Sequence, residues 1–251
     1  MSRKSVGFAL TVLLVVTSAA FADSFTFAGT GNVTWNGVYV NPYTAHDNTT
    51  DKDLTIYCDD WNTDFSGNPT WNANVYALTA SNLSLFRFGN TTPNYNVTVQ
   101  NNQLVASLSA TPVPLNRYLE AAWLDEQAMK ELQKPNPSAN IQEELAAAAW
   151  TLFVDGSHVN GLIGGINGSG TTFVNAVYNY LQSAQAAVED PVHPYTAAGW
   201  DVIVPRGRTT VGGPMQEFLT YSANPEPSTV IMVATLVGLL AFKRFGHNRP
   251  A

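Results

Sequence analysis

Cys58 is the single cysteine of this 251-residue chain, and its thiol can act as a nucleophile when it is ionised. One cysteine excludes a disulfide within the chain and a cluster of cysteine metal ligands. Three interpretations of the residue remain open: a small buried hydrophobic side chain on a strand, the partner of a cysteine in another molecule, and a reactive thiol.

The acidic residues that follow Cys58 could hold a cation. The pattern Asp60-x-Asn62-x-Asp64 matches the first three ligand positions of a calcium-binding loop. Position six of that loop is Phe65, where glycine is needed, and position twelve is Trp71, where a bidentate glutamate belongs. The segment is therefore not an EF-hand. Asp60, Asn62 and Asp64 remain candidates for an irregular calcium site, with solvated loop acids as the alternative.

A hydrolase would need a pair of acids in one site, and the adjacent pairs Asp59–Asp60 and Glu143–Glu144 are the candidates. Adjacent residues point to opposite faces of a strand and lie about 100° apart on a helix, so neither pair forms a ready dyad. The four histidines have no metal-ligand spacing, and the sequence has no Gly-x-Ser-x-Gly motif and no glycine-rich phosphate loop. We therefore expect a protein that is not an enzyme and that has no cofactor.

Short strands are the elements that would position Cys58. From Ser24 to about Pro112 the chain alternates polar and apolar residues and is rich in Val, Thr, Tyr and Trp, which is typical of β-strands. Turn-forming stretches with Asn, Gly and Pro separate the segments. The predicted strands are SFTFAG, NVTWNGVYV, LTIYCDDW, NVYALTA, LFRFG and YNVTVQN.

Helical patterns begin at about Leu115. The segment RYLEAAWLDEQAMKELQK predicts one helix, with Asp125 away from its apolar face, and IQEELAAAAWTLFVD predicts a second, capped by Asn140 and Glu143. A third helix is predicted over residues 171–188, followed by the strands GWDVIVPR and MQEFLTYSA. Because these closing strands need edges that the early strands supply, we predict a single α+β ectodomain over residues 23–223.

Composition and charge limit the class of partner. Charged residues make up 12% of the chain, a low share that is common in exported proteins. The segment from Asp23 to Asn224 has seven basic and eighteen acidic residues, a balance of −11. Because the sequence has no basic stripe that could contact phosphates, we exclude nucleic acid as a partner.

The first 22 residues have the parts of a secretory signal peptide in the expected order. MSRK supplies a positive n-region, VGFALTVLLVV an apolar core, and Ala20-Phe21-Ala22 a small-x-small cleavage site. A buried first strand or helix is the alternative. We predict export through the Sec translocon, removal of residues 1–22 by signal peptidase, and a mature chain that begins near Asp23.

Residues 224–251 combine a proline-rich start, an apolar run and a basic tail. The run from Ser228 to Phe242 would form about 22 Å of helix, against about 30 Å for the core of a bilayer. Length alone favours a buried core helix or a signal-like segment. However, two prolines break any preceding element, and Lys243 and Arg244 follow the run as in a stop-transfer segment. We predict a membrane helix over residues 228–242 and a basic tail over residues 243–251.

This C-terminal segment resembles the PEP-CTERM sorting signal of Gram-negative bacteria. The resemblance covers residues 224–251 and rests on the motif Pro225, Glu226, Pro227 and Ser228, the apolar span and the basic end. It implies that an exosortase, which is a membrane cysteine protease, recognises the motif and processes the tail. The implied location is the inner membrane before processing, and then the cell surface or the extracellular space.

The surroundings of Cys58 resemble bacterial surface thioester domains, in which a cysteine is joined to a glutamine side chain and the bond attaches the protein covalently to a host surface. The similarity covers Trp35 to Phe153. It rests on GVYVNPY at residues 37–43, IYCDD at residues 56–60, and Ala148-Ala149-Trp150, which fits the end of the family's helical Thr-Gln-x-Ala-x-Trp motif.

The glutamine of that motif falls on Ala146 in this chain, and the nearest glutamine is Gln142, one helical turn earlier and about 6 Å away along the axis. The resemblance therefore implies Cys58 and Gln142 as the candidate thioester pair.

Three functions are compatible with these observations. The first is a non-enzymatic binding or structural protein of the cell surface or biofilm matrix, in contact with exopolysaccharide or with another surface protein. Its aromatic side chains could stack on sugar rings or belong to the core; they include Trp35, Trp61, Trp71 and Tyr76. The second is a covalent adhesin with an internal thioester, and the third is a hydrolase.

Overall fold

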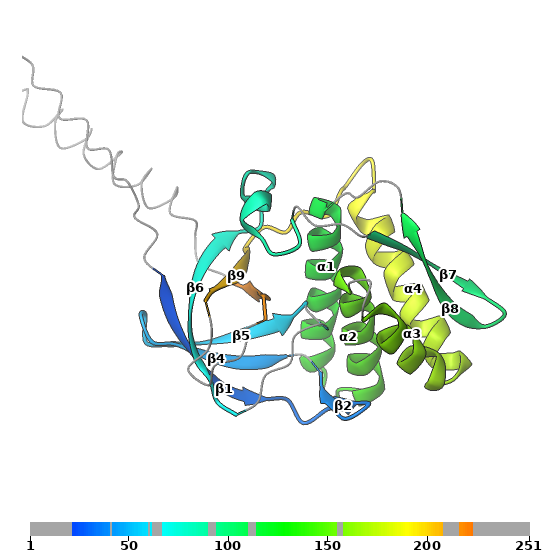
Figure 1. Cartoon of the computed structure of the whole chain (residues 1–251), viewed down its shortest axis with the longest axis horizontal. Coiled ribbons are helices and arrows are strands. Elements are labelled where there is room, and N and C mark those ends of the chain that lie inside the picture. The colour runs from blue at the N-terminus through cyan, green and yellow to red at the C-terminus, as the bar shows by residue number, and fades with distance from the viewer. Residues whose placement is uncertain are drawn as a thin grey trace, which may run out of the picture.

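The computed structural model shown in Figure 1 describes residues 22–40, 42–59, 61, 67–89, 94–109, 114–154, 158–207 and 216–222. The predicted sorting segment 224–251, including Pro225–Ser228, and residues 1–21 of the predicted signal peptide lie outside these ranges. Among the described helices, none has both the length and the hydropathy that crossing a membrane requires.

Six strands close into a barrel in the order β1-β4-β5-β10-β9-β6. Each neighbouring pair is antiparallel. Closure pairs both sides of every strand, so this sheet has no free edge. The strands are β1 Asp23–Thr30, β4 Tyr43–Asp47, β5 Lys52–Cys58, β6 Thr70–Ala77, β9 Trp200–Arg206 and β10 Phe218–Tyr221.

Side chains alternate between the inside and the outside of the barrel, as the two-residue period of a strand requires. Phe25, Ile56, Cys58 and Phe218 belong to the cluster of buried residues that fills the barrel. Tyr57, between Ile56 and Cys58, belongs instead to the larger core that the barrel shares with the helices.

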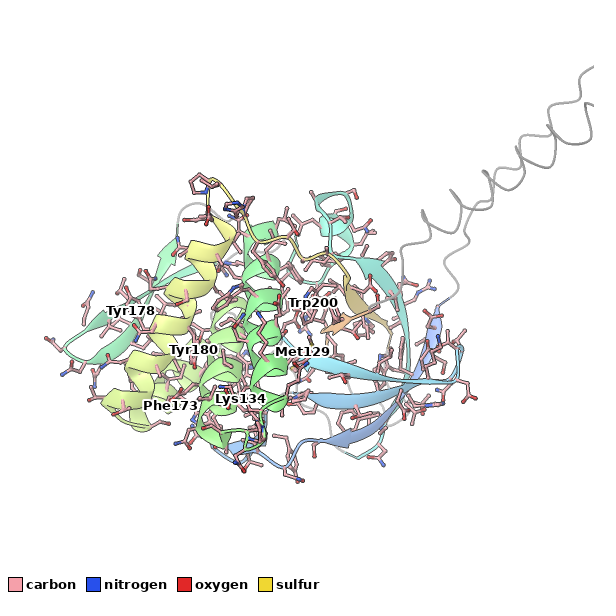
Figure 2. The ribbon with its side chains drawn as sticks, turned by 180° about the vertical axis from the view of Figure 1, so that it is seen from behind. Met129, Lys134, Phe173, Tyr178, Tyr180 and Trp200 are labelled. Carbon is pink, nitrogen blue, oxygen red and sulfur yellow. The ribbon has the colours of Figure 1, made fainter. Side chains whose placement is uncertain are left out.

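In the described part of the chain, four α-helices lie between β6 and β9, beside one another on one side of the barrel (Figure 1). They are α1 Pro114–Leu132, α2 Ala139–Phe153, α3 Val159–Gly168 and α4 Thr171–Val188. Trp200, at the start of β9, lies between the helices and the barrel (Figure 2) and belongs to the shared core. The described chain is therefore an α+β structure whose two layers pack on common apolar side chains.

Two short hairpins and a 3-10 helix complete the described elements. The hairpin of β2 Thr34–Trp35 and β3 Val38–Tyr39 turns at Asn36-Gly37, and both turn residues have positive φ. The hairpin of β7 Asn94–Gln100 and β8 Gln103–Ser109 turns at two asparagines with positive φ and packs against α3 and α4 (Figure 1). Asparagine and glycine tolerate this conformation, which the tight turns of hairpins need. The 3-10 helix, η1, covers Ala80–Leu85.

Several predicted elements agree with the structure. The helix α4 has the predicted bounds, and β9 and β10 fall within the segments predicted for them. The helices α1 and α2 overlap their predicted segments but begin three and two residues earlier, at Pro114 and Ala139. Four of the described elements were not predicted: β4, η1, β8 and α3.

Three predictions of local structure were wrong. The segment LFRFG is not a strand. Its Leu85 ends η1 and the four residues after it form a turn, because Phe86 is buried against Tyr118 and not in a sheet. The N-cap of α2 is Ser138, whose Oγ accepts a hydrogen bond from the Ile141 amide, and not Asn140. Asp125 was expected away from the apolar face of its helix and is only 3% exposed.

Candidate functional site

Cys58 is the last residue of β5, at the point where this strand pairs with the first residue of β10. Cys58 and Phe218 are partners in the antiparallel register of the two strands. Both side chains face the barrel interior. A residue two positions before Phe218 is expected on the same face as Phe218, and this residue is Gln216.

The thiol of Cys58 donates a hydrogen bond to the side-chain carbonyl of Gln216. The distance between Sγ and Oε1 is 3.0 Å. Both residues are buried, with exposed fractions of 2% for Cys58 and 8% for Gln216. The structure thus places a nucleophile against a carboxamide carbonyl although 158 positions separate the two residues in the sequence.

Gln142, the partner implied by the sequence resemblance, lies in the first turn of α2 and is also buried. The residue of α2 that contacts Cys58 is Trp150, whose indole Nε1 donates to the Cys58 carbonyl oxygen at 3.0 Å. Gln142 is eight residues before Trp150, which corresponds to about 12 Å along the helix axis. The glutamine side chain that accepts the thiol hydrogen bond is that of Gln216, which is therefore a second candidate partner beside Gln142.

The indole of Trp150 is held by other aromatic rings. Its ring centroid is 4.9 Å from that of Trp61 and 6.2 Å from that of Trp35. Trp35 in turn stacks on Phe173 of α4 at 5.5 Å and donates through Nε1 to Ser169 Oγ. This cluster fixes the helices to the strand end that carries Cys58.

A second group of polar side chains lies behind the Cys58–Gln216 pair. The residues that follow the pair in the sequence are both acids, Asp59 and Glu217, and their exposed fractions are 1% and 0%. Tyr118 of α1 donates a hydrogen bond to Glu217 Oε1. Burial raises the pKa of Tyr118 well above its ordinary value, and the negative charges of Glu217 and Asp59 raise it further. The hydroxyl therefore keeps its proton at neutral pH and remains a donor.

The other candidate sites from the sequence are a calcium site and pairs of adjacent acids. The calcium candidates Asp60, Asn62 and Asp64 lie outside the described residues. Within the described ranges no group of His, Cys, Asp and Glu has the arrangement of a metal site. Glu143 and Glu144 lie side by side on α2, and partial burial raises the pKa of each. As adjacent residues on a helix they do not converge on one point.

The aromatic residues that could have stacked on sugars belong to the core. Trp35 and Trp71 are buried, with exposed fractions of 4% and 3%. Trp61 and Tyr76 are half-buried and pack against the shared core. This arrangement favours the core interpretation of these residues.

Of the residues in this site, Cys58 was predicted from the sequence, whereas Gln216, Glu217 and Tyr118 were not. The segment MQEF was assigned to a closing strand, and two-residue alternation in that strand would have placed Gln216 on the face of Phe218. Which strand would lie beside β5 could not be read from one sequence, so the partner of the thiol could not be read either.

Comparison with known proteins gives no relative for this chain. No family model, no curated protein and no solved structure matches it. The interpretation of the site therefore rests on its geometry.

Proposed function

We propose that this chain is an exported, non-enzymatic surface protein whose barrel carries an internal thioester between Cys58 and Gln216, through which it attaches covalently to amines. The observation that supports this proposal is the contact of 3.0 Å between Cys58 Sγ and Gln216 Oε1 in a buried setting.

The bond can form from these two side chains without an oxidant or a cofactor. The sulfur of Cys58 attacks Cδ of Gln216, a carbon–sulfur bond forms, and the carbon–nitrogen bond of the carboxamide breaks. The nitrogen leaves as ammonia and carries away the thiol proton. Proximity supports the step, because holding two reacting groups in contact removes most of the entropic cost of bringing them together.

The attachment step is a transfer of the acyl group. The amine of a partner attacks the thioester carbon, an amide forms with the Gln216 side chain, and Cys58 regains its proton as the carbon–sulfur bond breaks. The balance of −11 over residues 23–224 attracts cationic groups, so a lysine side chain is the expected class of amine. Burial of the pair limits access of water, the competing nucleophile, and also of the amine, so attachment requires that the bond become accessible when the partner binds.

The ends of the chain supply the proposed location. Residues 1–22 act as a signal peptide, and residues 224–251 act as a PEP-CTERM signal for an exosortase. A non-covalent surface or matrix protein that contacts exopolysaccharide is the alternative. Aromatic stacking on sugars has little support because Trp35 and Trp71 are buried.

The intact mass of the purified protein tests the thioester. We expect it to be lower by the mass of one ammonia than the sequence requires, and Cys58→Ala and Gln216→Ala should each abolish the deficit. Gln142→Ala is the matched control, since it removes the other candidate glutamine, and it should keep the deficit. A native protein of unmodified mass would contradict the proposal, and loss of the deficit in Gln142→Ala alone would return the assignment to Gln142.

A further inference from the structure

Gln216 lies just outside the paired part of β10. The pairing of β10 with β5 begins at Phe218, and the two residues before it are in no strand. The ladder therefore does not by itself fix the position of the Gln216 backbone. Some other contact must do so if the carboxamide is to stay against the thiol.

Glu217 makes such a contact on the opposite side of the chain. Its side chain is fully buried, and its Oε1 accepts a hydrogen bond from Tyr118 Oη. Its Oε2 accepts a hydrogen bond of 2.7 Å from the backbone amide of Arg87. The carboxylate thus ties the chain next to Gln216 to α1 and to the turn after η1.

Tyr118 is itself held from several directions. Its hydroxyl oxygen accepts a hydrogen bond of 3.1 Å from the Phe88 amide. Its ring packs against Phe153 and Phe86, with centroid distances of 4.8 and 5.0 Å. Because both partners of the Tyr118–Glu217 bond are buried and fixed by further contacts, the bond is a rigid link and not a surface contact.

The alternation of side chains along a strand also places Asp59 on the side of the chain that faces Tyr118. Asp59 follows Cys58 as Glu217 follows Gln216, and its charge acts on Tyr118. The two dipeptides Cys58-Asp59 and Gln216-Glu217 therefore present their first side chains to each other and their second side chains to the region of Tyr118.

We propose that Tyr118 and Glu217 are positioning residues that hold the Gln216 carboxamide against the Cys58 thiol. This inference rests on the proposed thioester. Neither residue exchanges atoms with the reacting groups; both act through the backbone of residues 216 and 217.

The test uses Tyr118→Phe, Glu217→Ala and Glu217→Gln, with Tyr57→Phe as the matched control. Tyr57 is a fully buried tyrosine next to Cys58, and its hydroxyl makes none of the hydrogen bonds that hold Glu217. For each full-length protein, circular dichroism and thermal unfolding establish that the sample is folded. Mass spectrometry then gives the fraction of protein molecules that have lost one ammonia. Iodoacetamide labelling gives the alkylation rate of Cys58 in the molecules that keep a free thiol.

Per folded molecule, we expect Tyr118→Phe and Glu217→Ala to form the thioester about tenfold more slowly, the change that corresponds to losing one hydrogen bond to a charged group. Alkylation of the remaining free thiol should be faster, because the carboxamide no longer stays against Sγ. Glu217→Gln keeps one acceptor oxygen and should retain more thioester than Glu217→Ala. Tyr57→Phe should behave like the native protein.

If Tyr118 and Glu217 only stabilise the fold, their variants should unfold at a lower temperature but form the thioester normally per folded molecule. That result would overturn this inference and leave the proposed thioester unchanged. If the native protein has the unmodified mass, the proposed thioester is wrong. The inference is then tested by the alkylation rates of Cys58 alone. Equal rates in the native protein, Tyr118→Phe and Glu217→Ala would then overturn it.

Discussion

Cys58 is restrained at two atoms by groups from different parts of the chain. Gln216 accepts from its sulfur, and Trp150 donates to its carbonyl oxygen. Reactions between groups held at about 3–3.5 Å gain most of the available advantage of proximity. The contact of 3.0 Å in this barrel joins Sγ to Oε1, the atom next to the carboxamide carbon, so the thiol must move from this oxygen to the carbon before it can attack.

Glu120 offers a residue-scale prediction about pH. Burial raises its pKa to about 7, and the nearby charge of Glu189 also raises it, whereas Arg117 lowers it. Between pH 4.5, its ordinary value, and pH 7, the unfolded chain releases this proton while the folded chain keeps it. The unfolded state then binds fewer protons, so the free energy of unfolding should fall as the pH rises through this window, by about 1–3 kcal/mol.

Urea unfolding at pH 5 and pH 7 measures this change. Glu120→Gln should reduce the fall, because the amide does not titrate, and should be the more stable protein at pH 7. The nearby Glu126, whose partly exposed side chain pairs with Lys130, supplies the control Glu126→Gln. An equal fall in the native protein and in Glu120→Gln would contradict the assignment.

At the scale of elements, α3 shows how packing can override helix propensity. Its sequence VNGLIGGING contains four glycines, which weaken a helix in isolation. A Cβ atom at Gly165 would lie 3.2 Å from the ring of Trp35 and 2.7 Å from the side-chain amide of Asn36, whereas one at Gly164 would meet nothing within 4 Å. Gly165 thus lets the β2–β3 hairpin approach the helix.

The two adjacent glycines give a matched pair of substitutions. Gly164→Ala should raise the free energy of unfolding by up to about 1 kcal/mol, since alanine favours the helix and the position is open. Gly165→Ala should lower it by about 1–3 kcal/mol, because the rigid Trp35 ring must move. Chemical denaturation of both variants measures the difference, and equal stabilisation by the two would show that the hairpin does not press on α3.

The elements that could be predicted from the sequence are those whose local pattern agrees with their packing. The period of apolar residues in α4 and the alternation in β9 were sufficient. The helix α3 was missed because its four glycines lower its helix propensity, and no local pattern reveals the contact that Gly165 makes with Trp35. LFRFG has the composition of a strand, but its Phe86 is used to cover Tyr118.

At the scale of the whole molecule, only one of the two residues of the site, Cys58, could be predicted from the sequence. A lone cysteine is visible in any sequence, but its partner depends on the order of strands in the barrel. β10 lies between β5 and β9, although the helices and the β7–β8 hairpin separate it from β5 along the chain. Such a long-range pairing leaves no local signal. The sequence prediction therefore rested on the thioester-domain motif, whose glutamine position falls on Ala146, and Gln142 is the glutamine nearest to that position.

The proposed sorting of the protein is also a prediction about the whole chain. In cells with an exosortase we expect cleavage near Pro225–Ser228, because the tail resembles its recognition signal. Mass spectrometry of the mature C-terminus measures the site, and replacement of Glu226 by Ala should prevent processing while Glu217 variants should not. A protein that ends at Ala251 in such cells would contradict the proposal.

The position of β10 also determines how the molecule would carry load. A bond from Cys58 to Gln216 would join two points that are 158 positions apart and would bypass the whole helical insertion. If the protein is pulled from its C-terminal end, tension would pass from β10 directly into β5, and the four helices between them would stay outside the path of the force. This path exists only while the thioester is intact. Once a partner amine has broken the carbon–sulfur bond, a load between that partner on Gln216 and the C-terminal end would pass through β10, and the helices would still lie outside it.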